Sequence, residues 1–122
     1  MLARFSKPAL ALLIATTLAA CSVSPEQAQE NRDTRLEKQF PKPADRAGLY
    51  IVWQSSYGKF NVEYLANEIS EATAVGRVGP LCRKLGQGDT AKLAERWTAM
   101  NRTVTLGDGS KAPVRAVKVN CV

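Results

Sequence analysis

The distribution of apolar and polar positions divides the chain into three zones. A mainly apolar run covers residues 8–18, polar and charged side chains dominate residues 22–46, and apolar positions become frequent again after residue 48. The first run is shorter than the ~20 residues of a membrane-spanning helix, and it has the length of a signal-peptide core. The middle zone has few large apolar side chains, so we expect it to be too polar to fold alone. The pattern predicts a leader, a flexible tether over residues 21–46 and one folded domain over residues 47–122.

The folded domain should begin with a strand. Residues 49–53 form a compact aromatic and β-branched run, which is typical of a buried strand. Residues 55–59 are rich in serine and glycine and predict a turn. After this turn, Phe60 and Val62 either continue into a second short strand or lead directly into a helix.

A helical pattern follows over residues 63–85, where apolar side chains recur at steps of three and four. Gly86 is a typical stop after such a helix. The pair Gly79-Pro80 interrupts the pattern, because proline lacks the amide hydrogen and its ring clashes with the preceding turn. We expect either one kinked helix or two helices, the second of which starts at Pro80.

The last part of the chain contains an ambiguous segment and a clear hairpin. Over residues 90–100, Leu93, Trp97 and Met100 have the spacing of a short amphipathic helix, with a strand as the alternative. The glycine-rich residues 107–110 predict a turn between strands. In the final strand Val117, Val119 and Cys121 share one face, so Cys121 should point into the core.

These elements predict an α+β fold, a small antiparallel sheet packed by one or two helices. The expected core residues are Tyr50, Val52, Ile69, Val78, Leu85, Leu93, Trp97, Val104, Val117 and Val119.

The leader ends in a recognisable motif. Arg4 and Lys7 precede the apolar run, which closes in Leu18-Ala19-Ala20-Cys21. This motif resembles the lipobox of bacterial lipoproteins. The resemblance implies that residues 1–20 are a signal peptide, that the Cys21 thiol receives a diacylglyceryl group and that the new amino terminus is acylated. Ser22, where some lipoproteins carry Asp, implies sorting to the outer membrane and its periplasmic face.

Two or three acyl chains would hold the protein on a membrane permanently. The alternative is an ordinary secretory signal followed by an unrelated cysteine.

The remaining two cysteines, Cys82 and Cys121, predict one disulfide. They are 39 positions apart, and an even pair in an oxidising compartment is typical of a covalent bridge in a small domain. Two unpaired buried thiols are the alternative. The chain has no histidine, and two thiols alone make a poor zinc site, so we expect no metal and no cofactor.

The formal charge is +6, and most of the surplus lies after residue 46. A basic domain would lie favourably near anionic lipid, lipopolysaccharide or wall polymers, although solubility alone also explains such a charge.

Motifs of common enzymes are absent from the sequence, and we expect no catalytic residues. Glu68 and Glu71 have the spacing of a paired carboxylate site, but such pairs are more often a solvated helix face. Tyr50, Trp53 and Tyr57 form either a binding face, as aromatics do for sugars, or part of the core. Tyr57 and Lys59, in a predicted turn, are the expected partner-binding residues.

The sequence therefore predicts a lipid-anchored, non-enzymatic lipoprotein of the Gram-negative envelope. It would act as a structural or accessory binding module that is attached to the membrane through Cys21. Its partner would be an envelope protein, the wall or a lipid, and we expect no binding of nucleic acid. One alternative is a periplasmic inhibitor that inserts the loop of residues 55–59 or 107–110 into an enzyme. A second alternative is an enzyme acting on the wall or on lipids.

Overall fold

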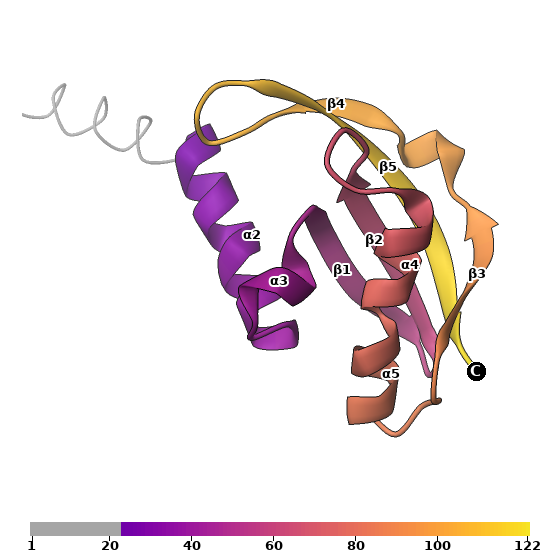
Figure 1. The fold of residues 1–122 in the computed structure, drawn as a ribbon. Coiled ribbons are helices and arrows are strands. Elements are labelled where there is room, and N and C mark those ends of the chain that lie inside the picture. Colours follow the sequence, from indigo (N-terminus) through magenta and orange to yellow (C-terminus); the bar gives the residue numbers. More distant parts are fainter. Residues whose placement is uncertain (1–22) are drawn as a thin grey trace, which may run out of the picture.

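The computed structural model describes residues 23–122 (Figure 1). The predicted signal peptide and Cys21 lie outside the described residues. The elements follow the chain in the order α2 (Pro25–Gln39), α3 (Pro43–Arg46), β1 (Leu49–Ser56), β2 (Lys59–Leu65), α4 (Glu71–Arg77), α5 (Gly79–Lys84), β3 (Ala91–Arg96), the 3-10 helix η1 (Thr98–Met100), β4 (Arg102–Thr105) and β5 (Lys111–Cys121).

The strands form one antiparallel sheet in the order β1-β2-β5-β3, and β4 also pairs with β5. Leu93 of β3 pairs with Val119, whereas Val104 of β4 pairs with Ala112. β3 and β4 therefore follow one another along the side of β5 that β2 leaves free, with η1 between them. This confirms the predicted α+β class, the first strand and the terminal hairpin. Of the two alternatives for the residues after the first turn, the structure has the second strand and not a direct entry into a helix.

The main core lies between the sheet and helices α4 and α5. Val62 and Val119 on the sheet meet Ala74, Val78 and Cys82 on the helices, and all five are fully buried. Alternate residues of β2 and β5 point to this face, as the pleat of a strand requires. A smaller second cluster contains Tyr50, Leu65, Ala112 and Val114.

The predicted tether is wrong from residue 24 onward. Ser24 caps α2 by accepting a hydrogen bond from the Gln27 amide, and the helix continues for 15 residues. Leu36 and Phe40 are only 4% and 3% exposed and belong to the main core. Their four-residue spacing places both on one face of a helix, so two apolar side chains are enough to dock an otherwise polar segment.

Helix α2 lies beside the edge strand β1 (Figure 1). The Gln39 side-chain amide donates a hydrogen bond of 2.9 Å to the Val52 carbonyl. Covering an edge in this way removes a site for unwanted strand pairing. The domain therefore begins near residue 24 and not at residue 47.

Polar contacts join α2 and β4 to the sheet as well. The Arg32 guanidinium stacks 4.2 Å from the Tyr50 ring centroid, and Arg102 lies 5.7 Å from the same centroid. Arg102 also approaches the buried Glu63 carboxylate to 2.6 Å, as an ion pair whose angles are not those of a hydrogen bond. The Arg102 guanidinium compensates the negative charge of Glu63, which would be costly to bury alone.

The helical prediction for residues 63–85 needs two corrections. Residues 63–65 belong to β2, so the helical part starts at Glu71. It then forms two helices, α4 and α5, with Pro80 in the first turn of the second, as one of the two alternatives predicted. Leu85 follows the end of α5 and is 45% exposed, so it is not a core residue.

The helix favoured for residues 90–100 is also wrong. Residues 91–96 form β3, and only Thr98–Met100 turn helically. The free side of β5 offers a ladder of backbone hydrogen bonds, and Leu93 reaches the core from a strand as well as it would from a helix. Within residues 23–122, no helix has the length and apolar character needed to cross a membrane.

Candidate functional site

Tyr57 and Lys59, the predicted partner-binding residues, lie at the turn between β1 and β2. This turn is at the end of the molecule opposite the amino terminus of α2 (Figure 1). Both side chains are exposed, and Tyr57 is 74% accessible. Gly58 has a φ of 69°, a conformation that favours glycine and makes the two-residue turn tight.

Hydrogen bonds from neighbouring segments hold this turn in place. The Tyr57 hydroxyl donates to the Gly86 carbonyl at 3.2 Å. The Gln87 side-chain oxygen accepts from the Gly58 amide and from the Gln54 side chain, both at 2.7 Å. The loop between α5 and β3 therefore fixes the turn. The exposed Tyr57 side chain is attached to a rigid backbone.

The predicted disulfide braces the same region. Cys82 and Cys121 are bonded, with an S–S distance of 2.03 Å and a Cα–Cα distance of 5.6 Å. The bond joins α5 to the end of β5, next to the turn, where the Cys121 amide donates to the Gly58 carbonyl at 2.8 Å. The prediction of the Cys82–Cys121 disulfide is confirmed.

Exposed apolar side chains gather at this end of the molecule. Three of the four exposed large hydrophobic side chains among the described residues lie here, namely Tyr57, Val122 (58%) and Leu85 (45%). The fourth, Val23 (65%), precedes α2 at the opposite end. Leu85 precedes the Gly86 that holds Tyr57, and the Val122 carbonyl accepts from Asp89 in the same loop. We call Tyr57, Leu85 and Val122, together with Lys59 beside them, the distal surface.

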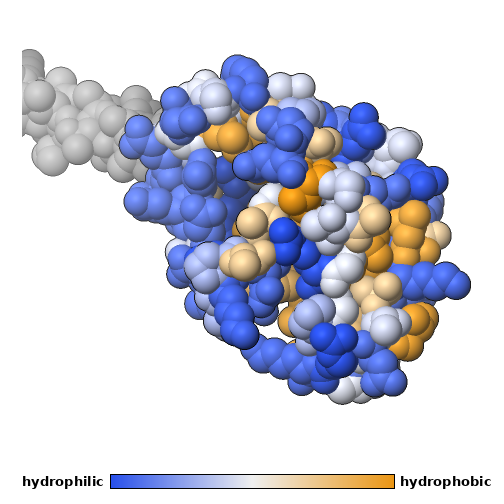
Figure 2. Space-filling view, in the orientation of Figure 1, coloured by the Kyte–Doolittle hydropathy of each residue, from blue (hydrophilic) through white to orange (hydrophobic). Residues whose placement is uncertain are grey.

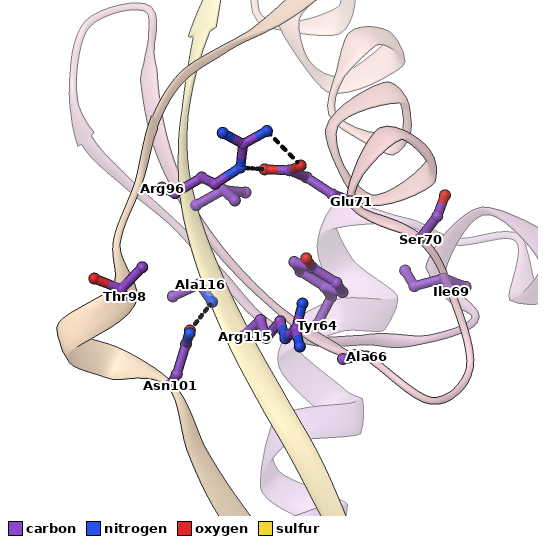
Figure 3. Close-up of a pocket in the computed structure, with 11 residues that line it drawn as sticks. Tyr64, Ala66, Ile69, Ser70, Glu71, Arg96, Thr98, Asn101, Arg115 and Ala116 are labelled. Atoms are coloured by element: carbon purple, nitrogen blue, oxygen red, sulfur yellow. Dashed lines mark hydrogen bonds and ion pairs between the residues drawn. The ribbon is translucent and has the colours of Figure 1, made fainter.

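A polar pocket between α4 and β5 is a second candidate site (Figure 3). It encloses about 230 Å³ and includes Tyr64, Glu71, Arg96, Asn101 and Arg115. The Arg96 guanidinium binds both oxygens of the Glu71 carboxylate, at 2.8 and 3.1 Å. The Asn101 side-chain oxygen accepts from the Ala116 amide at 3.3 Å.

The electrostatics of this pocket keep the Tyr64 phenol protonated and the Arg96 guanidinium charged. Burial raises the pKa of the Tyr64 phenol, and the nearby Glu71 carboxylate raises it further, whereas Arg115 and Arg96 oppose both effects. The hydrogen bonds to Glu71 raise the pKa of Arg96. The phenol thus remains a hydrogen-bond donor, and the Glu71 carboxylate is paired with the Arg96 guanidinium. The pocket can bind a small polar group, but its lining offers no free general base.

Glu68 and Glu71 do not share the face of one helix, as their spacing had suggested. Glu68 lies in the turn after β2, and only Glu71 belongs to α4. Sequence reasoning did not find Tyr64, Arg96 or Arg115 as pocket residues. Tyr64 and Arg115 are cross-strand partners, so the register between β2 and β5 is the information that would have linked them.

Among the described residues, no three or more acidic or cysteine side chains are grouped closely enough to hold a metal ion. Comparisons with protein-family models, with curated proteins and with solved structures found no match. The function must therefore be argued from the arrangement of the residues.

Proposed function

We propose that this protein is a lipid-anchored, non-enzymatic binding module of the Gram-negative envelope, which presents its distal surface to a partner protein. The observation that carries the proposal is the exposed apolar cluster of the distal surface, on a turn fixed by a disulfide and by hydrogen bonds. Grouped apolar side chains on the surface of a small domain are typical of an interaction site.

The position of the lipidation motif supports a distal surface that points away from the membrane, toward a partner. Cys21 precedes Ser24, the cap of α2, by three residues. Three extended residues span at most about 11 Å. A lipid on Cys21 would therefore hold the amino-terminal end of α2 near the membrane, and the distal surface would point away from it (Figure 1). The disulfide suits the oxidising periplasm, and Ser22 favours the outer membrane.

The chemistry of the distal surface favours a protein partner with an apolar contact and an acidic border. Tyr57 provides a large side chain on a rigid backbone, the kind of residue that often dominates interface energies. Lys59 is exposed beside it, and Arg83 and Lys84 form the basic last turn of α5. A partner would thus bury the aromatic ring and pair acidic side chains with the basic border.

The anchor is tested by mass spectrometry of the amino-terminal peptide. In the wild-type protein we expect cleavage before Cys21 and a mass increase that matches two or three acyl chains. Cys21→Ala should remove the lipid and leave the protein either uncleaved or released from membranes. An unmodified Cys21, or cleavage elsewhere in the wild type, contradicts the lipoprotein assignment.

The distal surface is tested by photo-crosslinking in intact cells. A photoreactive amino acid at position 57 should give a discrete crosslinked protein, whereas the same group at Lys42, an exposed residue before α3, should not. Capture by purified protein should fall at least tenfold on Tyr57→Ala with Lys59→Ala, at a stability change within about 1 kcal/mol. Equal adducts from positions 57 and 42, or unchanged capture, would show that the wrong surface was chosen.

A further inference from the structure

The face of the sheet opposite α4 and α5 carries a row of polar and aromatic residues. Trp53 pairs with Asn61, Asn61 with Lys118, and Lys118 with Glu95, so the row crosses β1, β2, β5 and β3. Asn61 stands between Phe60 and Val62, which point into the helix-covered core. Because side chains alternate along a strand, the row points to the other face, which we call the open face.

A cavity of about 370 Å³ lies on the open face. Its lining includes Ser55, Lys59, Asn61, Lys118 and Asn120. Asn61 is 7% exposed, and its side-chain amide makes no hydrogen bond with another residue in the part of the chain that the structure describes. The amide atoms are not sealed from solvent, so they remain accessible to a ligand through the cavity. The amide therefore suits a ligand that both donates and accepts hydrogen bonds.

An aromatic pair adjoins this amide. The ring centroids of Trp53 and Trp97 are 6.1 Å apart at an angle of 51°, and the Lys118 ammonium lies 4.8 Å from the Trp97 centroid. Both tryptophans are half-buried. An indole surface beside amide and hydroxyl groups fits a ligand with an apolar face and a polar edge. A pyranose ring has this character, because its axial C–H bonds form one face and its hydroxyl and acetamido groups form the edge.

The charged side chains around the cavity indicate which class of sugar it would bind. Lys59 and Lys118 line the cavity together with the acidic Glu95. Lys92, the register partner of Asn120, extends the open face at the same end. Three lysines against one glutamate favour a ligand that carries carboxylates.

We propose that the open face binds the glycan strand of peptidoglycan. In this mode the indole rings would stack on the sugars, the Asn61 amide would bind an acetamido group, and the lysines would pair with carboxylates of the stem peptides. The inference takes only the periplasmic location from the proposed function and uses a different surface.

The chain offers a direct probe, because Trp53 and Trp97 are its only two tryptophans. Purified lipidated protein in detergent is titrated with disaccharide peptides released from peptidoglycan by a muramidase, and tryptophan emission is recorded. We expect a saturable change in emission and co-sedimentation of the protein with intact sacculi. Asn61→Leu and Lys118→Met should each weaken binding about tenfold or more. Tyr64→Phe, in the pocket on the helix-covered face, is the matched control and should leave binding unchanged.

Several results would overturn the inference. One is emission that does not respond to the fragments, and another is binding that Asn61→Leu and Lys118→Met leave intact. Tighter binding of purified lipopolysaccharide, or equal binding of uncharged N-acetylglucosamine oligomers, would refute the assignment to peptidoglycan. Tyr57→Ala, at a residue outside the cavity lining, should retain tryptophan-detected binding while it weakens capture of the protein partner, so the two proposals fail separately.

Discussion

Replacing Phe40 by alanine tests whether α2 is a folded part of the domain. Phe40 is 3% exposed at the end of α2, and it packs in the same cluster as Leu36, Leu49 and Val52. Phenylalanine-to-alanine changes in cores cost about 3–5 kcal/mol, because apolar burial is lost and a cavity remains. Since a small domain has a total stability of roughly 5–15 kcal/mol, Phe40→Ala should remove a large share of it.

The assay is urea unfolding of the disulfide-bonded protein, monitored by tryptophan fluorescence. Leu85→Ala is the matched control, because Leu85 is apolar but 45% exposed, and its loss should cost no more than about 0.5 kcal/mol. Hydrogen exchange of the α2 amides provides a second reading, and they should be protected in the wild type and exchange faster in Phe40→Ala. If both variants unfold at the same urea concentration and the α2 amides exchange like those of an unfolded chain, α2 is not docked.

Two further predictions concern the disulfide and the ionisation of Tyr64. Cys82→Ala with Cys121→Ala opens a loop with a sequence separation of 39, for which the chain-entropy relation gives about 3.9 kcal/mol and a fall in Tm of roughly 15–30 °C. A reducing agent should lower the Tm of the wild type equally and leave the variant unchanged, so a reductant-insensitive wild type would contradict the assignment. For Tyr64, the folded-state pKa is raised above the ordinary value of 10.0, so its stabilisation is present below pH 10 and is lost as the pH rises through the folded-state pKa. Tyr64→Phe should therefore lose less stability than the wild type in alkaline urea titrations, and identical pH profiles would refute this effect.

Strand β1, the terminal hairpin and the disulfide could be predicted from local patterns because local chemistry decides them. The aromatic and β-branched run at the start of β1 and the glycine turn before β5 specify strands without knowledge of their partners. The alternation of Val117, Val119 and Cys121 along β5 placed Cys121 on the core face. Cysteine parity and compartment then led to the correct pair.

The wrong predictions have a common cause. In each case, contacts with residues that are distant in the sequence decided the structure of the segment. Residues 25–39 have a polar composition, and only docking of Leu36 and Phe40 against the sheet makes this segment part of the domain. Residues 91–96 became a strand because β5 had a free side for them to pair with. The α4–β5 pocket depends on the register that places Tyr64 opposite Arg115. None of these long-range pairings leaves a periodic signal in its own segment.

The folding of α2 also changes how an anchored protein would reach its ligands. A flexible coil of 25 residues would span roughly 25–30 Å and would let the domain rotate freely above the membrane. With α2 packed on β1, only the short segment between Cys21 and Ser24 remains to connect a lipid to the folded unit. Since α2 is fixed by Leu36, Phe40 and the Gln39–Val52 hydrogen bond, the membrane would constrain the orientation of the whole sheet. The distal surface would then face away from the bilayer, and the open face, which belongs to the same rigid sheet, would keep a constant position relative to it. The two surfaces share Lys59 but use different aromatic side chains, Tyr57 on the distal surface and the two tryptophans on the open face. A protein partner and a wall polymer would therefore compete only for the Lys59 ammonium.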